Sequence, residues 1–293
     1  MVATASDSAP VQSLTPAKLH CIAVRAETFL HPGVGQVLGS VDLPVAREAG
    51  TGMPYVAGSS MKGALRDRVE SFDKKAEAKV WFGDDSPGGS TSAGAVIVSD
   101  LRLVALPLRR LDKAFAYVTS PYLLKRLEQD IFLATGNTIN LPASVPAHDQ
   151  ALIFETSTPR FVIEDLAFQS AQGDAALLTA LASLGFPNVD EPLLKARLVV
   201  VSNKAMSWLT RYALPTRMRN ALTDKKTVLR GHLWSEEYLP PETLFSLLIG
   251  QRPNVPGAPL ANFQTFMKNS AKGLMQVGGN ETVGQGWLRW NVG

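Results

Sequence analysis

Near its C-terminus the chain reads Gly278-Gly279-Asn280-Glu281-Thr282-Val283-Gly284-Gln285-Gly286-Trp287. Four glycines in these ten positions allow the backbone to approach another backbone or a ligand closely, in conformations that residues with a Cβ resist. The stretch lies between two apolar segments, 274–277 and 287–290, that are typical of short strands. It predicts either a hairpin turn or a loop whose N–H groups hold a phosphate, and by itself it does not choose between them.

A second region rich in glycine and proline lies near the N-terminus and runs into a helix-like segment. Its motifs read His31-Pro32-Gly33-Val34-Gly35-Gln36, Ser40-Val41-Asp42-Leu43-Pro44-Val45-Ala46-Arg47-Glu48, Thr51-Gly52-Met53-Pro54 and Gly58-Ser59-Ser60-Met61-Lys62-Gly63-Ala64-Leu65-Arg66-Asp67. Loops of this length in compact domains are usually either functional or disordered. We expect residues 31–58 to form a long structured loop.

In this order, and closed by the C-terminal glycine loop, the motifs resemble the RAMP superfamily of repeat-associated RNA-binding proteins. Within it they look most like the filament-forming backbone subunits of type III-B CRISPR (Cmr) effector complexes. Further matching segments are 92–100, 118–122 and 237–243. The resemblance covers most of the chain and is weakest over residues 1–17, 134–150 and 169–195.

The composition and charge of the chain indicate which classes of protein it can belong to. The chain has 293 residues, of which 45% are apolar and 19% charged, as in ordinary globular proteins. No apolar run approaches the roughly 20 residues that cross a bilayer, so we expect no membrane partner. The single cysteine, Cys21, excludes an intramolecular disulfide and fits a reducing cytoplasm. The four histidines show no ligand spacing, so no tightly bound structural metal is expected.

Net charge is only +3, but one segment concentrates basic residues. The segment from Asn203 to Arg230 contains seven basic residues and one acidic residue, Asp224, so its net charge is 7 − 1 = +6. Such a segment repels itself unless it meets an anion. Either a solvated basic loop or contact with RNA explains it. The resemblance implies a basic "thumb", inserted at about residues 203–235.

Strands and helices interleave without the regular repeat of a doubly wound sheet, which favours an α+β fold. Strands are expected at 19–26, 95–108, 151–155, 161–168 and 196–202, and helices at 175–184 and 259–271. A further helix is expected to start at a capping Ser59 or Ser60, with one apolar stripe formed by Met61, Leu65, Val69 and Phe72. The resemblance implies a ferredoxin-like, RNA-recognition-motif-like core, in one RAMP domain at 18–293 after a flexible tail at 1–17.

Lys62 and Arg66 lie four residues apart and therefore share a helix face. Taken alone, they fit a solvated face on which Arg66 pairs with Glu70, or a phosphate-binding face. The resemblance implies that this helix start grips a guide RNA, which would also justify Gly63 in a helix. The RNA-binding residues that it implies are Arg47, Ser59, Ser60, Lys62, Gly63, Arg66, Arg217, Arg219, Lys225, Lys226, Gly278, Gly279, Asn280 and Thr282.

Asp42 is the candidate catalytic residue, because the resemblance places it where the family requires an aspartate for cleavage of target RNA. It would accept a proton from a 2′-hydroxyl or hold a hydrated divalent cation, Mg²⁺ or Mn²⁺. A reference pKa of about 3.9 makes it a weak base at neutral pH. Without the resemblance it reads as a turn residue that supports its loop. His31 either protonates a leaving oxygen or shapes a tight turn, and Glu236 and Glu237 are further acidic candidates.

The resemblance implies four kinds of partner: a CRISPR guide RNA, single-stranded target RNA, further copies of the chain and the other subunits of a type III-B complex. A purely structural RNA-binding filament subunit without nuclease activity is the alternative. A nucleotide-binding enzyme is a third hypothesis. The spacing of the glycines fits neither a Walker A loop nor a dinucleotide fingerprint, which argues against it.

Overall fold

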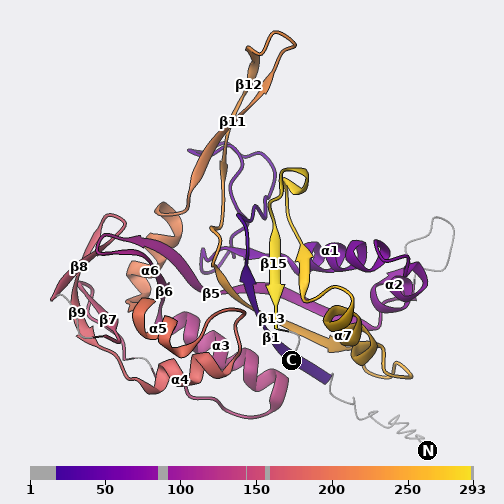
Figure 1. The fold of residues 1–293 in the computed structure, drawn as a ribbon, viewed down its shortest axis with the longest axis horizontal. Coiled ribbons are helices and arrows are strands. Elements are labelled where there is room, and N and C mark those ends of the chain that lie inside the picture. The colour runs from indigo at the N-terminus through magenta and orange to yellow at the C-terminus, as the bar shows by residue number, and fades with distance from the viewer. Residues whose placement is uncertain (1–17, 85–91, 143, 156–158, 292–293) are drawn as a thin grey trace, which may run out of the picture.

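The computed structural model describes residues 18–84, 92–142, 144–155 and 159–291 (Figure 1), so the expected tail at 1–17 lies outside the described residues. Within them an eleven-stranded mixed sheet dominates the fold, which is α+β as expected. Its strands lie side by side in the order β14 (Leu274–Gln276), β15 (Trp287–Trp290), β1 (Lys18–Ala26), β13 (Leu244–Gln251), β5 (Val96–Arg110), β6 (Lys113–Thr119), β10 (Leu198–Val201), β7 (Gln150–Ile153), β9 (Leu166–Gln172) and β8 (Arg160–Ile163). The short β2 (Tyr55–Val56) pairs with β5 off this path.

The sheet has two halves that share the long strand β5. In the first half, β15, β1, β13 and β5 are antiparallel neighbours. In the second half, β6 and β10 pair in parallel, as do β7 and β9. Strand β8 returns to β5 through the pair Arg110 and Ile163, so the second half closes on itself.

Helices cover both faces because side chains alternate across each strand. On β1, Val24 belongs to one buried cluster and Ala23 to another. The first cluster includes residues of α1 (Gly58–Glu70), α2 (Lys75–Phe82) and α7 (Pro259–Asn269). The second includes residues of α3 (Pro121–Thr135), α4 (Ala176–Ser183) and α5 (Glu191–Arg197). No helix in the described part of the chain is long and apolar enough to cross a membrane.

Two local expectations were wrong. The first helix begins at Gly58, before both serines, and Asp100 of β5 accepts a hydrogen bond from Gly58 N at 2.7 Å, so neither serine caps it. The stretch at 161–168 contains the end of β8 and the start of β9. Glu164 adopts a left-handed φ of 50° between them and so makes the turn.

A two-stranded hairpin, β11 (Thr216–Leu222) with β12 (Val228–Glu237), projects from the sheet (Figure 1). We call Thr216–Glu237 the thumb hairpin. It is narrower than the expected insertion at about 203–235, because α6 (Asn203–Tyr212) buries Met206 and Leu209 in the main core. Cross-strand pairing gives the hairpin two faces. The exposed apolar residues of one face are Met218, Leu222, Val228 and Leu233.

The chain ends in the hairpin of β14 and β15, whose connection is the glycine loop, residues 277–286. Gly286 has a φ of +84°, and an added Cβ would lie 2.1 Å from Val277 O. Gly286 O also accepts a hydrogen bond from Val277 N at 2.9 Å. At this position a side chain is excluded both by the backbone conformation and by space.

We predict that Gly286→Ala destabilises the protein by at least about 2 kcal/mol more than Gly284→Ala. Gly284 is a matched control, because its φ of +80° imposes the same strain while an added Cβ would meet nothing within 4 Å. Urea unfolding of the two variants measures the difference. Equal destabilisation would show that the contact with Val277 relaxes without cost.

Candidate functional site

Asp42 lies at the base of the thumb hairpin, tied to strand β12. Ser235 donates two hydrogen bonds to Asp42 Oδ2, from its backbone N and its hydroxyl, both at 2.8 Å. On either side the backbones are joined, because Leu43 N donates to Ser235 O and Glu237 N donates to Leu43 O, each at 3.0 Å. The carboxylate is therefore held by the hairpin and not only by its own loop.

These contacts also set the charge of Asp42. The backbone N–H and the hydroxyl of Ser235 stabilise the carboxylate and lower the pKa of Asp42 below its ordinary value. The group is ionised at neutral pH and is a poor proton acceptor. Oδ1 accepts no hydrogen bond from any described residue, which leaves one carboxylate oxygen free to act on a ligand.

His31 is buried beside the same strand with a fixed tautomer. Its Nδ1 lies 2.7 Å from Glu237 O, and a carbonyl oxygen can only accept, so Nδ1 carries a proton. The neutral ring then keeps its lone pair on Nε2. A Cβ at Gly33 would lie 2.5 Å from Nε2, so glycine is required beside this edge of the ring. These contacts are what shaping the turn requires, and proton transfer by His31 stays a prediction.

A buried carboxylate, Glu236, joins the thumb hairpin to the glycine loop. Oε1 accepts a hydrogen bond from Trp234 Nε1 at 2.8 Å, and Oε2 accepts one from Asn280 Nδ2 at 2.8 Å. Oε2 also accepts the hydroxyl of Tyr238 and forms an ion pair with Arg219 at 3.3 Å. Burial raises the pKa of Glu236, but these hydrogen bonds and the charge of Arg219 outweigh burial and lower it to about 2.

Glu237 holds the N-terminal loop in a similar way. Its Oε1 accepts a hydrogen bond from Arg47 Nη2 at 2.7 Å, and its Oε2 accepts one from Val45 N at 3.0 Å. Arg47, one of the residues assigned to RNA, therefore forms a half-buried ion pair with Glu237, and its contact with RNA stays a prediction.

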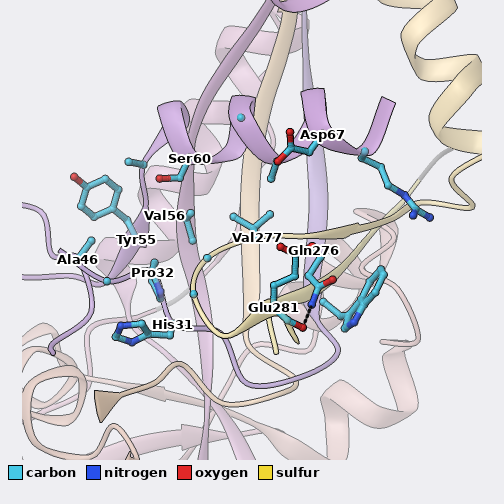
Figure 2. A pocket seen from close by; sticks show the side chains of 18 of the residues that line it. His31, Pro32, Ala46, Tyr55, Val56, Ser60, Asp67, Gln276, Val277 and Glu281 are labelled. Carbon is cyan, nitrogen blue, oxygen red and sulfur yellow. Dashed lines mark hydrogen bonds between the residues drawn. The ribbon is translucent and has the colours of Figure 1, made fainter. Parts of the chain in front are cut away.

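The glycine loop packs against the backbone of His31. Gly279 N donates to His31 O at 3.0 Å, and a Cβ at Gly278 would lie 2.7 Å from the same oxygen. This loop and helix α1 line an open groove with a volume of about 700 Å³ (Figure 2). A Cβ at Gly63 would meet no atom of another described segment within 4 Å, so Gly63 leaves space in the groove.

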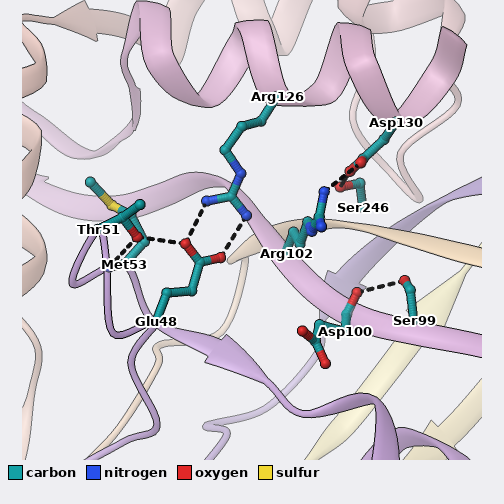
Figure 3. Close-up of polar contacts among 9 residues, drawn as sticks. All are labelled: Glu48, Thr51, Met53, Ser99, Asp100, Arg102, Arg126, Asp130 and Ser246. Atoms are coloured by element: carbon teal, nitrogen blue, oxygen red, sulfur yellow. Dashed lines mark hydrogen bonds and ion pairs between the residues drawn. The ribbon is translucent and has the colours of Figure 1, made fainter. Parts of the chain in front are cut away.

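Polar contacts anchor the loop of residues 31–57 to the sheet and to α3 (Figure 3). Arg126 donates to both carboxylate oxygens of Glu48, at 2.7 and 3.0 Å. Close by, Asp130 accepts hydrogen bonds from Arg102 at 2.7 Å and from Ser246 at 2.9 Å. The two hydrogen bonds between Arg126 and Glu48 fix the orientation of the guanidinium relative to the carboxylate. They hold the loop in place, so it is structured as expected.

The other cations assigned to RNA fall into two groups. Arg66 pairs with Glu70 at 3.0 Å, whereas Lys62 forms no ion pair with a described residue. On the thumb hairpin, Arg217 lies 3.8 Å above the ring of Phe29 and is part of the base. Arg217 nevertheless remains exposed, and the full set of exposed residues among those assigned to RNA is Ser59, Ser60, Gly63, Arg217, Lys225, Lys226, Gly278, Gly279 and Thr282.

The described residues do not form a resident metal centre. No group of three or more His, Cys, Asp or Glu side chains in them is placed to hold an ion. Both oxygens of Glu236 are occupied by hydrogen-bond donors, so among the two carboxylates Asp42 and Glu236 one oxygen, Asp42 Oδ1, is available to a metal ion. One oxygen is too few to hold an ion by itself.

Sequence reasoning missed the residues that hold the candidates in place. Ser235 and Trp234 had no spacing or motif that linked them to Asp42 or Glu236. Tyr238 fell in a segment noted for resemblance only. Arg219 and Asn280 were assigned to RNA, but they bond to each other and to Glu236.

Comparison with known proteins identifies the family of this chain. Residues 24–289 match the RAMP superfamily. The CRISPR system Cmr endoribonuclease Cmr4 of Pyrococcus furiosus is 32% identical over 283 residues, covering 93% of this chain and 95% of the relative. Subunit Cmr4 of Saccharolobus solfataricus is 26% identical, covering 91% of this chain and 94% of the relative.

Solved structures share the fold. Oligomeric Cmr4 from Pyrococcus furiosus superposes with a TM-score of 0.69 at 26% identity, covering 94% of this chain and 97% of that one. A chain of the type III-B Cmr-β complex bound to cognate target RNA gives a TM-score of 0.69 at 21% identity, covering 93% and 96%.

We predict that Glu236 makes stability depend on pH. Its pKa falls from an ordinary 4.5 to about 2 in the folded state, so the unfolded chain binds the proton more tightly. The stabilisation, roughly 3 kcal/mol, is fully present above about pH 5 and is lost as the pH falls toward 2. Urea unfolding should therefore show Glu236→Gln less stable than the unmutated protein at pH 7, with the gap more than halved at pH 3.

Glu281→Gln is the control, because Glu281 is an exposed carboxylate outside this network. Its effect on stability should be small at both pH values. A gap for Glu236→Gln that is equal at pH 7 and pH 3 would contradict the lowered pKa.

Proposed function

Because the chain belongs to the RAMP superfamily, and within it to the Cmr4 backbone subunits of type III-B CRISPR complexes, we propose that it binds guide RNA as a repeated backbone subunit and cleaves the target RNA paired with that guide. The observation that carries the proposal is Asp42, held at the base of the thumb hairpin by Ser235. One subunit then contains both the projecting element and the carboxylate, so cuts would occur once per subunit along the target.

The core of this subunit is ferredoxin-like, in the sense of a βαββαβ unit. Strands β15, β1, β13 and β5 lie in the order 4-1-3-2 of that unit, all antiparallel. Helix α1 lies between β1 and β5 in sequence, and α7 lies between β13 and β15. The second half of the sheet and the thumb hairpin are then insertions between the second and third core strands.

The chemistry is attack of a 2′-hydroxyl on the adjacent phosphorus: the 2′-O–P bond forms, the P–O5′ bond breaks, the 2′-hydroxyl loses a proton and the leaving 5′-oxygen gains one. Asp42 is ionised and a poor base, so its role is to orient the attacking group through Oδ1 and to stabilise positive charge near it. His31 Nε2 is the group able to give or take a proton, because Nδ1 is committed to Glu237 O. Any Mg²⁺ or Mn²⁺ would arrive with the phosphates of RNA, since the described residues form no cage for it.

RNA binding would be largely independent of sequence, through phosphate and sugar. The groove between α1 and the glycine loop would take part of the guide, with Gly63 leaving room in its lining. Lys62 does not line the groove, so it would meet the guide on another face of α1. The exposed cations of the thumb turn, Lys225 and Lys226, would meet target RNA. Partners are further copies of the chain, the other subunits of the complex and both RNAs, in the cytoplasm.

A purely structural RNA-binding subunit is the second candidate, and one observation favours it. Asp42 accepts two hydrogen bonds from Ser235 and so helps to fix the loop to the hairpin. A carboxylate with that structural role needs no catalytic one.

We predict that Asp42→Asn abolishes target cleavage in the assembled complex and leaves folding, guide binding and target binding unchanged. Asparagine keeps an acceptor oxygen for Ser235 but replaces the other oxygen by an amide NH2 and removes the charge, so the structural role of Asp42 survives while its free oxygen is lost. Denaturing gels of labelled target RNA measure cleavage, and thermal unfolding measures the fold. Cleavage at the unmutated rate would favour the structural subunit.

Two controls identify the chemistry. The unmutated complex should leave 2′,3′-cyclic phosphate ends, and a single 2′-deoxy nucleotide at one scissile position should block that cut alone. Ser235→Ala keeps the carboxylate but releases Oδ2 from the hydroxyl, so it should slow cleavage less than Asp42→Asn does.

We predict that Lys62→Ala together with Arg66→Ala weakens guide binding for all RNA sequences and flattens its dependence on salt. Each phosphate contact with single-stranded RNA contributes about 0.7 to the slope of log affinity against log salt. Since Arg66 is partly engaged by Glu70, the expected loss of slope is about one. Fluorescence anisotropy over a salt series measures it, and an unchanged slope would place the guide elsewhere.

A further inference from the structure

Helix α6 lines a pocket that the proposed function does not use. The pocket has a volume of about 500 Å³ and lies between α6, strand β9 and residues 148–149. Lys204, Trp208 and Arg211 line it at spacings of four and three, so they share one face of the helix. The opposite face buries Met206 and Leu209 in the core, which fixes the orientation of the helix.

The pocket combines flat apolar surface with positive charge. The rings of Trp208 and Tyr212 lie 5.2 Å apart with an interplanar angle of 46°, and Tyr212 remains 62% exposed. Buried Phe168 of β9 adds to the apolar lining. An exposed aromatic ring beside a half-buried one is a surface on which a planar group can stack.

Three basic side chains stand around these rings. Lys204 and Arg211 form no ion pair with any described residue, and His148 lies across the pocket from α6. The acid in the lining, Asp149, accepts a hydrogen bond from Gln169 Nε2 at 3.1 Å. The pocket therefore favours an anion attached to a planar group.

We propose that this pocket binds one unpaired nucleotide of RNA, with the base against the two aromatic rings and its phosphate beside Lys204 and Arg211. The inference rests on the proposed function, which supplies single-stranded RNA to the protein. A paired base cannot enter, because stacking on a side chain requires a base that has left its helix. Helix α6 ends three residues before the thumb hairpin begins, so a strand bound along the hairpin passes close to the pocket.

The test uses an eight-nucleotide oligouridylate that carries one 5-iodouridine, irradiated with the full chain. Cross-links read by mass spectrometry should map to Trp208 or Tyr212. Trp208→Ala with Tyr212→Ala should weaken binding of the oligonucleotide about tenfold in an anisotropy assay, since base stacking has effects of this size. Trp208→Phe with Tyr212→Phe should restore most of the affinity, because the rings remain.

The outcomes separate this inference from the proposed function. If the unmutated protein binds no RNA, both fail. Binding by the unmutated protein with cross-links elsewhere, and no effect of the alanine pair, overturns the pocket alone. If the alanine pair disrupts association between copies of the chain in sedimentation while RNA affinity is unchanged, the surface is a protein interface and the inference is wrong.

Discussion

The carboxylate of Glu236 is the point on which the functional half of the molecule depends. A buried charge is tolerated only where donors satisfy it, and here the donors come from three separate segments. Arg219 and Trp234 belong to the thumb hairpin, Asn280 to the glycine loop, and Tyr238 to the chain that returns to the core. Because each segment needs the same two oxygens, none can shift without leaving a polar group unpaired, and the hairpin is fixed relative to the loop.

The hydrogen bonds around Glu236 and Asp42 explain why these two carboxylates have different roles. Glu236 has both oxygens occupied, so it can organise its surroundings but has no oxygen free for a ligand. Asp42 gives Oδ2 to Ser235 and keeps Oδ1 free. The difference between the two residues follows from the number of hydrogen-bond donors around each carboxylate. The amino-acid sequence alone does not show that number.

Prediction from the sequence was reliable where the residues of one segment determine the structure of that segment. Met61, Leu65 and Val69 form the buried stripe of α1, and the strand expected at 19–26 is β1, both as local spacing predicts. The fourth residue of that stripe, Phe72, lies beyond the end of α1 and is exposed. It failed where a residue far away in the sequence determines the structure or the contacts of a segment. Asp100 caps α1 from 42 positions away, and Glu236 binds Arg219 and Asn280 in contacts that no local pattern indicates. The resemblance implied an insertion at about residues 203–235, and the first ten residues of that range form α6, which buries an apolar face in the core.

The polar contacts that fix the thumb hairpin are confined to its base, at residues 217–219 and 234–238. Beyond them two strands pair with no third strand beside them, and their side chains alternate between the two faces. The register between the strands already shifts between the pairs Asn220–Leu233 and Leu222–Val228, where β11 advances by two residues and β12 by five. Residues gained or lost in one strand can therefore be absorbed as a bulge, so the reach of this element can change without disturbing the contacts at its base that hold Asp42 and Glu236.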